Sequence, residues 1–452
     1  MNPATSTLHL DKALTPEGWR RDVRVTLQSG VISALEIGAA AREGDERHAL
    51  GVPGIANVHS HAFQRAMSGL AERLGAATDN FWSWRETMYR FALEMTPDQV
   101  EAVAAQAYVE MLEAGFTRVG EFHYLHHAPD GRPYQDVAEM SGRIVAAADA
   151  TRIGLTLLPV FYAHSGFGGA PPGDTQRRFI CDLHLYARLV ERARDQLRTL
   201  DGADLGLAPH SLRAVTPREL EAVCALAPGG PLHIHIAEQV AEVDACLAWS
   251  GARPVEWLLD HAHVGPRWCL IHATHMTPEE TRRLAESGAV AGLCPITEAN
   301  LGDGLFNAPD FVGRGGRFGI GTDSNVQISL AGELRLLEYG QRLSHRARNV
   351  LGKSSGSTGR AMFDGTQQGG ALALGRTPAG LRVGADADIV TLRPDAIGGE
   401  DDDVLDGWIF SGGAWVDRVF ARGRAVVRDG EHIARDAIRD RFRVTMLQLL
   451  AK

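Results

Sequence analysis

Residues 52–61 read VPGIANVHSH, an apolar run that closes on His59 and His61 with one residue between them. Apolar runs without alternation are typical of strands that helices cover on both faces. Residues two apart in a strand point to the same side, so the two imidazoles could hold one ion. An isolated pair with this spacing is more often two ordinary histidines than a metal site. Other residues of the chain must therefore show whether a metal site is present.

Similar apolar runs recur through the middle of the chain, separated by segments of helical length. They are TRVGEFHY (117–124), GLTLLPVFY (154–162), DLGLAPHS (204–211), PLHIHIAE (231–238), WCLIHATH (268–275), AVAGLCPI (289–296) and GRFGIGTDS (316–324). Thr-Pro pairs at 96–97, 216–217 and 277–278 predict helix starts, because threonine caps a helix and proline suits its first position. With the first run the strands number eight, which predicts an α/β fold with a (β/α)8 TIM-type barrel over residues 51–375.

Both ends of the chain consist of short segments in which apolar and polar residues alternate. DVRVTLQSG at 22–30 and WVDRVFARGRAVVRDGEHI at 415–433 are examples, and such alternation favours half-buried antiparallel strands. Neither end alone could bury both faces of a sheet. We therefore predict one small β-sandwich domain built from residues 1–50 and 376–452, with a C-terminal helix.

The composition limits the partners and the compartment. Lys plus Arg number 46 against 56 Asp plus Glu, a formal charge of −10 without a basic cluster, which argues against a nucleic-acid partner. Five scattered cysteines without a C-x-x-C pair are typical of reduced thiols. The start lacks a signal-peptide pattern, and no run of ~18 apolar residues occurs. We expect a cytoplasmic protein without a membrane partner.

Polar side chains occur at the ends of the predicted barrel strands. His235, His272 and Asp323 join the first two histidines there, and barrel active sites form at the mouth to which these ends point. Burying such groups without partners costs a few kcal/mol each, about 1–3 for most polar groups. A shared metal would satisfy them together, and imidazole and carboxylate ligands suit Zn²⁺ or a similar divalent ion.

The motifs resemble those of the amidohydrolase superfamily, from VPGIANVHSH to Thr322-Asp323-Ser324, over nearly the whole chain. Members with two metals bridge them through a lysine of a middle strand. The lysines of this chain, Lys12, Lys353 and Lys452, lie outside the barrel strands. The resemblance therefore implies one Zn²⁺ per subunit, or another divalent metal, held by His59, His61, His235 and Asp323.

Single-metal members similar to this chain are deaminases, whose H-x-x-E motif on the fifth strand supplies an acid. His235 and Glu238 match that motif. The resemblance implies three catalytic residues, Glu238, His272 and Asp323. Asn57 stands where the family usually has Asp, and we expect this departure to alter hydrogen bonds around the metal ligands without abolishing the site.

Several further runs resemble the formimidoylglutamate deiminases within that superfamily. They are VHSHAFQRAMSGLAE, FWSWRETMYR, EFHYLHH, HSLRAVTP, HIHIAEQ and TEANLGDG. By position they imply substrate-binding roles for Gln64, Arg85, Tyr124, His210 and Arg213. Arginine binds carboxylates in a bidentate manner, and formiminoglutamate carries two of them. Asn325 replaces the His of some relatives, which bears on substrate geometry.

Packing roles stay open for some of these residues. Arg85 lies in an aromatic segment and could stack there, Tyr124 and His210 could be polar core residues, and Gln64 could cap a helix. We assign no function to four other histidines and expect them to be structural or to lie at the rim: His126, His127, His164 and His275. Whether the loops around 75–90 and 125–135 close over a substrate also stays open.

The resemblance implies hydrolysis of N-formimino-L-glutamate to N-formyl-L-glutamate and ammonia, in histidine degradation. In that reaction Asp323 and His272 orient the attacking water, Asp323 takes its proton, and Glu238 protonates the leaving nitrogen. It also implies a homodimer that acts on a small dicarboxylate. Two alternatives stay open: a purine or adenosyl-nucleoside deaminase with the same metal set, and a metal-free scaffold protein.

Overall fold

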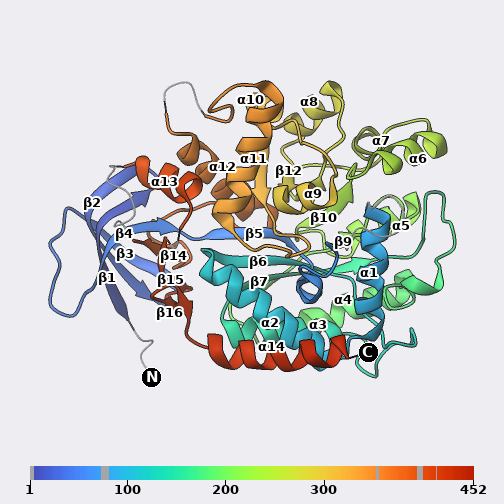
Figure 1. Cartoon of the computed structure of the whole chain (residues 1–452), viewed down its shortest axis with the longest axis horizontal. Coiled ribbons are helices and arrows are strands. Elements are labelled where there is room, and N and C mark those ends of the chain that lie inside the picture. Colours follow the sequence, from blue (N-terminus) through green and yellow to red (C-terminus); the bar gives the residue numbers. More distant parts are fainter. Residues whose placement is uncertain (1–4, 73–80, 353–355, 394–400, 414, 452) are drawn as a thin grey trace.

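The computed structural model describes residues 5–72, 81–352, 356–393, 401–413 and 415–451, with the backbone alone for 81–83. Strands from both ends of the chain form one eight-stranded sheet, in the order β17-β16-β15-β14-β4-β1-β2-β3. These strands are β1 Ser6–Thr15, β2 Gly18–Gln28, β3 Val31–Ile37, β4 Glu46–Pro53, β14 Ile389–Leu392, β15 Val416–Ala421, β16 Arg424–Arg428 and β17 Glu431–His432. Figure 1 shows this sheet at one end of the molecule.

The two halves of the terminal sheet meet edge to edge where β14 pairs antiparallel with β4, with Val390 opposite Val52. The expected strands from both termini are present, and their inner side chains, such as Leu8, Val23 and Ile389, share a core cluster of their own. The predicted β-sandwich is not confirmed. Backbone pairing between β4 and β14 joins the halves into one continuous hydrogen-bonded sheet.

The middle of the chain forms a second, parallel sheet in the order β10-β11-β12-β13-β5-β6-β7-β8, with β9 paired to β7. Its strands are β5 Ile55–Ser60, β6 Phe116–His123, β7 Gly154–Phe161, β8 Asp204–Leu205, β9 Ala208–Pro209, β10 Leu232–Ile236, β11 Trp268–His272, β12 Val290–Leu293 and β13 Arg317–Ile320. Every predicted apolar run contributes to it, and β6 and β7 are buried throughout. Parallel bridges join Leu207 to Leu232 and Ser211 to His235, so the β8–β9 segment also contacts β10.

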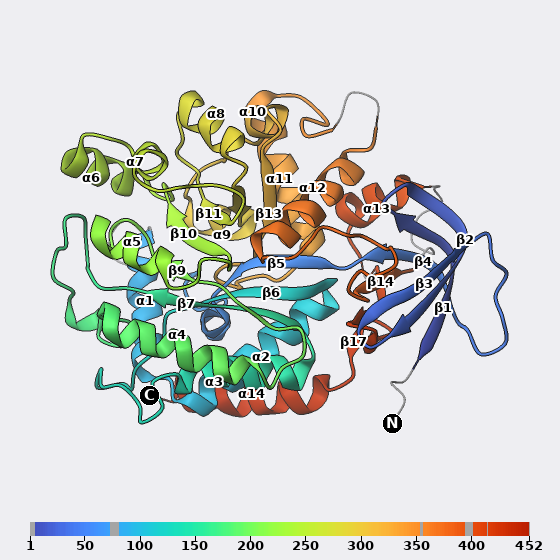
Figure 2. The same ribbon diagram turned by 180° about the vertical axis from the view of Figure 1, so that it is seen from behind.

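Helices surround this sheet on its outer side (Figure 2). In chain order the helical segments are η1 Ala62–Met67, α1 Phe81–Glu94, α2 Pro97–Glu113, α3 Glu139–Thr151, η2 Asp174–Gln176, α4 Leu183–Leu197, α5 Pro217–Ala225, α6 Val240–Ser250, α7 Pro254–His261, α8 Pro278–Ser287, α9 Pro295–Leu301, α10 Ala308–Gly313, α11 Leu330–His345, α12 Thr358–Ala373, α13 Asp403–Ser411 and α14 Arg435–Leu450. Capping boxes at Thr96, Thr216 and Thr277 confirm the predicted helix starts.

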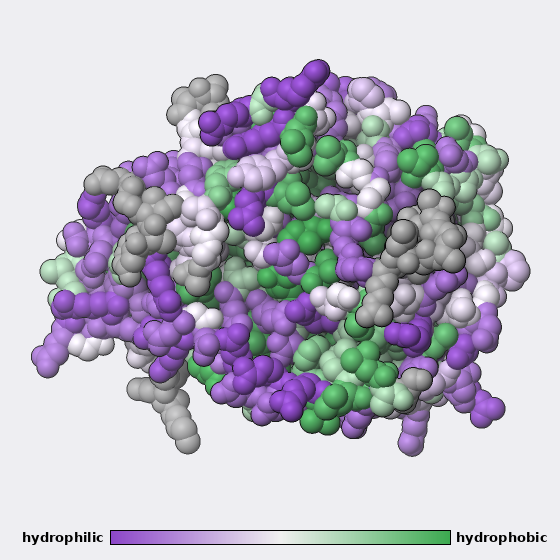
Figure 3. Space-filling view, viewed as in Figure 1, coloured by the Kyte–Doolittle hydropathy of each residue, from purple (hydrophilic) through white to green (hydrophobic). Residues whose placement is uncertain are grey.

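The C-terminal helix α14 leaves the terminal sheet and packs on α2 (Figure 1). Gln99 Nε2 donates to Gln448 Oε1 at 3.2 Å, and Arg441 Nη1 donates to Glu101 Oε1 at 2.6 Å. The last helix therefore lies against the middle region and not over the terminal strands. Among the described residues no helix has the length and apolar character needed to span a membrane. Hydrophilic side chains cover much of the face in Figure 3, with apolar patches between them.

Candidate active site

The four expected metal ligands converge at the ends of β5, β10 and β13. His59 Nε2 lies 3.2 Å from His61 Nε2 and 3.0 Å from His235 Nε2. Asp323 Oδ1 lies 3.3 Å from His59 Nε2 and 3.2 Å from His61 Nε2. Ligand atoms that each lie about 2.1 Å from one ion are separated by roughly 3–3.4 Å, and these four separations have that spacing. All four ligand atoms lie within 4.8 Å of one another.

The hydrogen bonds of the imidazoles also fit a metal. His61 Nδ1 lies 2.9 Å from the carbonyl oxygen of Phe122, and His235 Nδ1 lies 3.1 Å from that of His210. A carbonyl only accepts, so both Nδ1 atoms carry hydrogen and leave the Nε2 lone pairs for an ion. Burial also lowers the pKa of His59 to about 3. Neutral imidazoles that face each other and a carboxylate are the donor set that a divalent cation requires.

Asn57 and Asn325 lie behind the ligands and do not line the pocket. Asn57 Oδ1 accepts from the backbone N–H groups of His59 (3.2 Å) and Thr322 (3.1 Å), which ties β5 to β13. Asn325 Nδ2 donates to the carbonyl oxygens of His61 (3.2 Å) and Asp323 (3.1 Å). Both asparagines therefore fix the ligand-bearing backbone. We expected Asn325 to bear on substrate geometry. Its side chain is instead fully buried and does not line the cavity.

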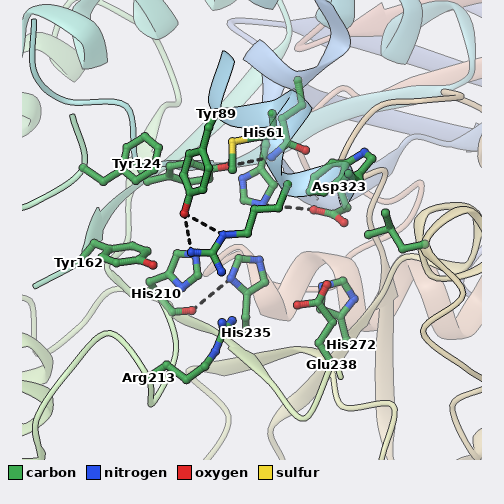
Figure 4. A pocket seen from close by; sticks show the side chains of 16 residues that line it. His61, Tyr89, Tyr124, Tyr162, His210, Arg213, His235, Glu238, His272 and Asp323 are labelled. Atoms are coloured by element: carbon green, nitrogen blue, oxygen red, sulfur yellow. Dashed lines mark hydrogen bonds and ion pairs between the residues drawn. The ribbon is translucent and has the colours of Figure 1, made fainter. Parts of the chain in front are cut away.

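Glu238 and His272 lie side by side next to the ligands (Figure 4). Glu238 Oε1 is 3.8 Å from His272 Nε2, and the Glu238 side chain is 8 % exposed. Burial raises the pKa of Glu238, as a group that must give up a proton near neutral pH requires. Burial would lower the pKa of His272, but the carboxylates of Glu238 and Glu298 outweigh it and raise that pKa to about 10.

One cavity brings together three of the expected metal ligands (His61, His235 and Asp323), Glu238 and the expected substrate-binding residues (Figure 4). All five of the latter line it: Gln64, Arg85, Tyr124, His210 and Arg213. The lining also includes residues to which the sequence assigned no role: Trp84, Met88, Tyr89, Tyr162, Phe179 and Leu301. Trp84, Met88 and Tyr89 share α1 with Arg85, and helical spacing could have suggested them.

Two guanidinium groups approach the cavity from different elements. Arg85 of α1 donates from Nε to Tyr89 Oη at 2.7 Å, and its guanidinium carbon lies 5.1 Å from the Tyr89 ring centre. Arg213 follows β9, and its buried Nε has no hydrogen-bond partner among the described residues. Burial would lower the pKa of Arg213, but the charge of Glu242 and other anionic groups raises it. The cavity can therefore bind two negative groups.

The other polar lining residues are neutral hydrogen-bonding groups. Gln64 Nε2 donates to Tyr124 Oη at 2.7 Å, while the buried Gln64 Oε1 has no partner within the described chain. Burial and the nearby Arg213 lower the pKa of His210 well below its usual value. Its ring centre lies 4.5 Å from that of Tyr162. These groups can orient a polar ligand without adding charge.

The histidines to which we assigned no function lie outside the cavity lining. His126 and His127 make hydrogen bonds of 2.8 Å with the carbonyl oxygens of Val160 and Ile180. His164 pairs with Glu219 at 2.8 Å, and His275 has a buried Nε2 without a described partner. Of the two loops considered as lids, the one around 75–90 is described only from residue 81, where α1 begins, and its residues 84, 85, 88 and 89 line the cavity. Residues 125–135 do not line the cavity.

Comparison with known proteins extends these observations. Residues 51–426 match the Amidohydrolase family, and residues 5–49 match the family described as Formimidoylglutamate deiminase HutF, N-terminal domain. The chain is 51% identical over 434 residues to a formimidoylglutamate deiminase of Pseudomonas aeruginosa, covering 94% of this chain and 96% of that protein. Its identity to an 8-oxoguanine deaminase of the same organism is 29% over 393 residues, or 85% of this chain and 83% of the relative.

A solved structure has nearly the same fold. The crystal structure of an amidohydrolase from Brucella melitensis is 58% identical and covers 98% of this chain and 100% of its own. The two superpose with a TM-score of 0.97.

Proposed function

The chain belongs to the amidohydrolase family, and within it we propose that the protein hydrolyses N-formimino-L-glutamate to N-formyl-L-glutamate and ammonia, as a step of histidine degradation. The observation that carries this proposal is one cavity lined by three members of the metal-ligand cluster, by the buried Glu238 and by two arginines. The 51% identity to a formimidoylglutamate deiminase over 94% of the chain supports it.

The two arginines explain the choice of a dicarboxylate substrate. Arg85 and Arg213 reach the cavity from α1 and from the turn after β9. Each guanidinium can bind one carboxylate through two parallel hydrogen bonds. Gln64, Tyr124 and His210 line the same cavity and can hold the formimino group by neutral hydrogen bonds. A flat purine ring carries no carboxylate for either guanidinium to bind, which disfavours the ring-deaminase alternative.

We propose that one Zn²⁺ per subunit is held by His59, His61, His235 and Asp323, because three imidazoles and a carboxylate suit zinc best among common ions. Another divalent metal could use the same ligands. When bound, such an ion supplies Lewis-acid activation of water near neutral pH. The complete ligand cluster also disfavours a metal-free scaffold.

The side chains around the ligands divide the proton transfers between them. Asp323 takes the proton that the attacking water loses, and His272 Nε2 orients this water toward the formimino carbon. Glu238 gives a proton to the terminal nitrogen, and as the carbon–nitrogen bond to that atom breaks, the added hydroxyl loses its second proton and becomes the formyl oxygen. The two protons that the water loses balance the two that the imino nitrogen gains before it leaves as ammonia. The position of Glu238 against the terminal nitrogen, and not against the glutamate nitrogen, decides that ammonia is released and not formamide.

The direct test is to incubate the purified, zinc-loaded protein with N-formimino-L-glutamate and to measure ammonia and N-formylglutamate together. Equal amounts of both products are expected. Guanine and S-adenosylhomocysteine serve as competing substrates in the same assay. Ammonia from either of these, without turnover of N-formimino-L-glutamate, would contradict the proposal and support a ring deaminase.

We further propose that residues 51–375 are a closed (β/α)8 barrel and that residues 1–50 and 376–452 are a separate small domain. Support for closure comes from the parallel bridges Leu207–Leu232 and Ser211–His235. A β-sandwich arrangement of the terminal strands, a homodimer and a cytoplasmic location stay predictions.

A further inference from the structure

Glu298 touches His272 from the side away from the cavity. It belongs to the short helix α9, its side chain is 6 % exposed, and it does not line the cavity. Glu298 Oε1 lies 3.3 Å from His272 Nδ1, while Nε2 of the same ring faces Glu238. Glu298 can therefore act on the reaction only through His272. The TEANLGDG run contains this residue, but the sequence gives it no role.

The contact decides which nitrogen of His272 faces the cavity. Glu298 Oε1 also accepts the backbone N–H of Cys294 at 2.9 Å, so this oxygen is an acceptor. Nδ1 of His272 must then carry hydrogen, whether the ring is neutral or charged. Nε2 is left as the ring nitrogen that can orient water or exchange a proton. If the ring turned over, a carbon would take the place of Nε2.

The backbone of His272 makes an external anchor useful. His272 and Ala273 have φ angles of +68° and +47°, in the left-handed region that residues with side chains rarely adopt. The strand ends at His272, so its ring leaves the regular sheet at this point. A buried carboxylate that is itself held by the Cys294 N–H gives the ring one fixed direction.

We propose that Glu298 is a positioning residue, which holds His272 with Nε2 toward the cavity and thereby sustains turnover. The inference rests on the proposed function, because it concerns the efficiency of that reaction. Carboxylates that orient a functional histidine in this way commonly contribute about 10–100-fold to activity. The effect should fall on kcat, since Glu298 does not contact the cavity in which substrate binds.

Glu333 provides a matched control for a purely structural role. It is fully buried on α11, and its Oε2 accepts the backbone N–H of Ile296 at 2.8 Å. Glu333 therefore supports the start of α9 at Ile296, as Glu298 does two residues earlier at Cys294. Unlike Glu298, it makes no contact with His272. Burial raises the pKa of Glu333 well above its usual value, so Gln is a close neutral replacement.

The experiment compares Glu298→Ala, Glu298→Gln and Glu333→Gln in the zinc-loaded full chain, with metal content and melting temperature measured for each. We expect Glu298→Ala to lower kcat about 10–100-fold with KM changed less than about threefold. Glu298→Gln keeps an acceptor oxygen and should recover part of the loss, and it covers the case in which the Ala variant does not fold. Glu333→Gln should keep kcat within about twofold. Unchanged kcat in both Glu298 variants, or an equal loss in Glu333→Gln, would overturn the inference.

Two further measurements separate this inference from the proposed function. In a His272→Asn background, Glu298→Ala should cause no additional loss of kcat, whereas an additional loss would show a route that bypasses His272. Long-range ¹H–¹⁵N NMR of histidine-labelled protein should show hydrogen on His272 Nδ1 in the unmodified chain and a changed signal in Glu298→Ala. An inactive unmodified chain would contradict the proposed function, while an unaltered His272 signal would contradict the positioning role by itself.

Discussion

In the proposed reaction, the choice of leaving group depends on Glu238. Replacing Glu238 by Gln keeps its size but removes the proton that it delivers, so kcat should fall by roughly 10²-fold or more. Substrate binding should persist because the two arginines are untouched. The measurement is kcat and KM of the zinc-loaded variant, with metal analysis as the control. A kcat equal to that of the unmodified chain would remove Glu238 from the mechanism.

Arg213 is expected to bind one carboxylate of a dicarboxylate substrate. Its buried Nε has no partner among the described residues, so we expect a substrate carboxylate to satisfy it. Arg213→Met should raise KM by about tenfold or more and lower kcat much less, because the lost contact is the same in the ground and transition states. Arg218→Met is the matched control, since Arg218 is exposed on the following helix. An unchanged KM for Arg213→Met would place the carboxylate elsewhere.

Sequence patterns identify some of these residues and miss others for a physical reason. His59, His235 and Asp323 lie at strand ends, and parallel strands bring their ends together whatever the loops do. Glu298 reaches His272 because α9 packs against particular neighbours. That packing depends on contacts far apart in the chain, which apolar periodicity does not encode.

Helix α1, which carries Arg85 and Tyr89, depends on Arg178 for its position. Arg178 is fully buried, and it donates to the carbonyl oxygens of Met95 (2.9 Å) and His127 (2.7 Å), just beyond α1 and β6. Burial lowers the pKa of this guanidinium to about 10. The neighbouring Phe179 lines the cavity, so Arg178 joins two walls of the site. No local motif could reveal contacts across such separations.

Removing this guanidinium should loosen α1. Arg178→Met leaves at least two buried carbonyl groups without donors, at a cost of about 1–3 kcal/mol each. We expect a lower melting temperature and a higher KM, because Arg85 loses its fixed position. Arg177→Met, a change at the more exposed neighbour that pairs with Asp174, should have a much smaller effect on both. Equal effects of the two substitutions would show that Arg178 has no special role.

The division of the molecule into two sheets follows from the sequence only in part. Alternation at both ends predicts antiparallel strands, and apolar runs predict the parallel sheet. The pairing of β14 with β4 joins residues more than three hundred positions apart, and alternation does not say which strand lies beside which. The position of α14 on α2 likewise depends on side chains such as Gln448 and Gln99, whose contact no local pattern encodes.

Acid should destabilise the whole molecule through histidines that are buried in the neutral form. Burial lowers the pKa of His123 to about 3, and it also lowers the pKa values of His126 and His127. In the unfolded chain these groups titrate near their ordinary pKa of about 6.5, so below that pH the unfolded state binds more protons. Their contribution to stability is complete above pH ~6.5 and is lost as the pH falls toward the folded-state pKa values.

The melting temperature, measured with a chelator present so that metal loss does not contribute, should therefore drop steadily from pH 7 to pH 4. His126→Gln removes one of these groups while an amide N–H can still donate to the carbonyl oxygen of Val160. It should reduce the dependence of the unfolding free energy on pH by up to about 1.4 kcal/mol per pH unit, the value for one proton. Parallel pH curves for the two proteins would show that His126 does not contribute to the acid sensitivity.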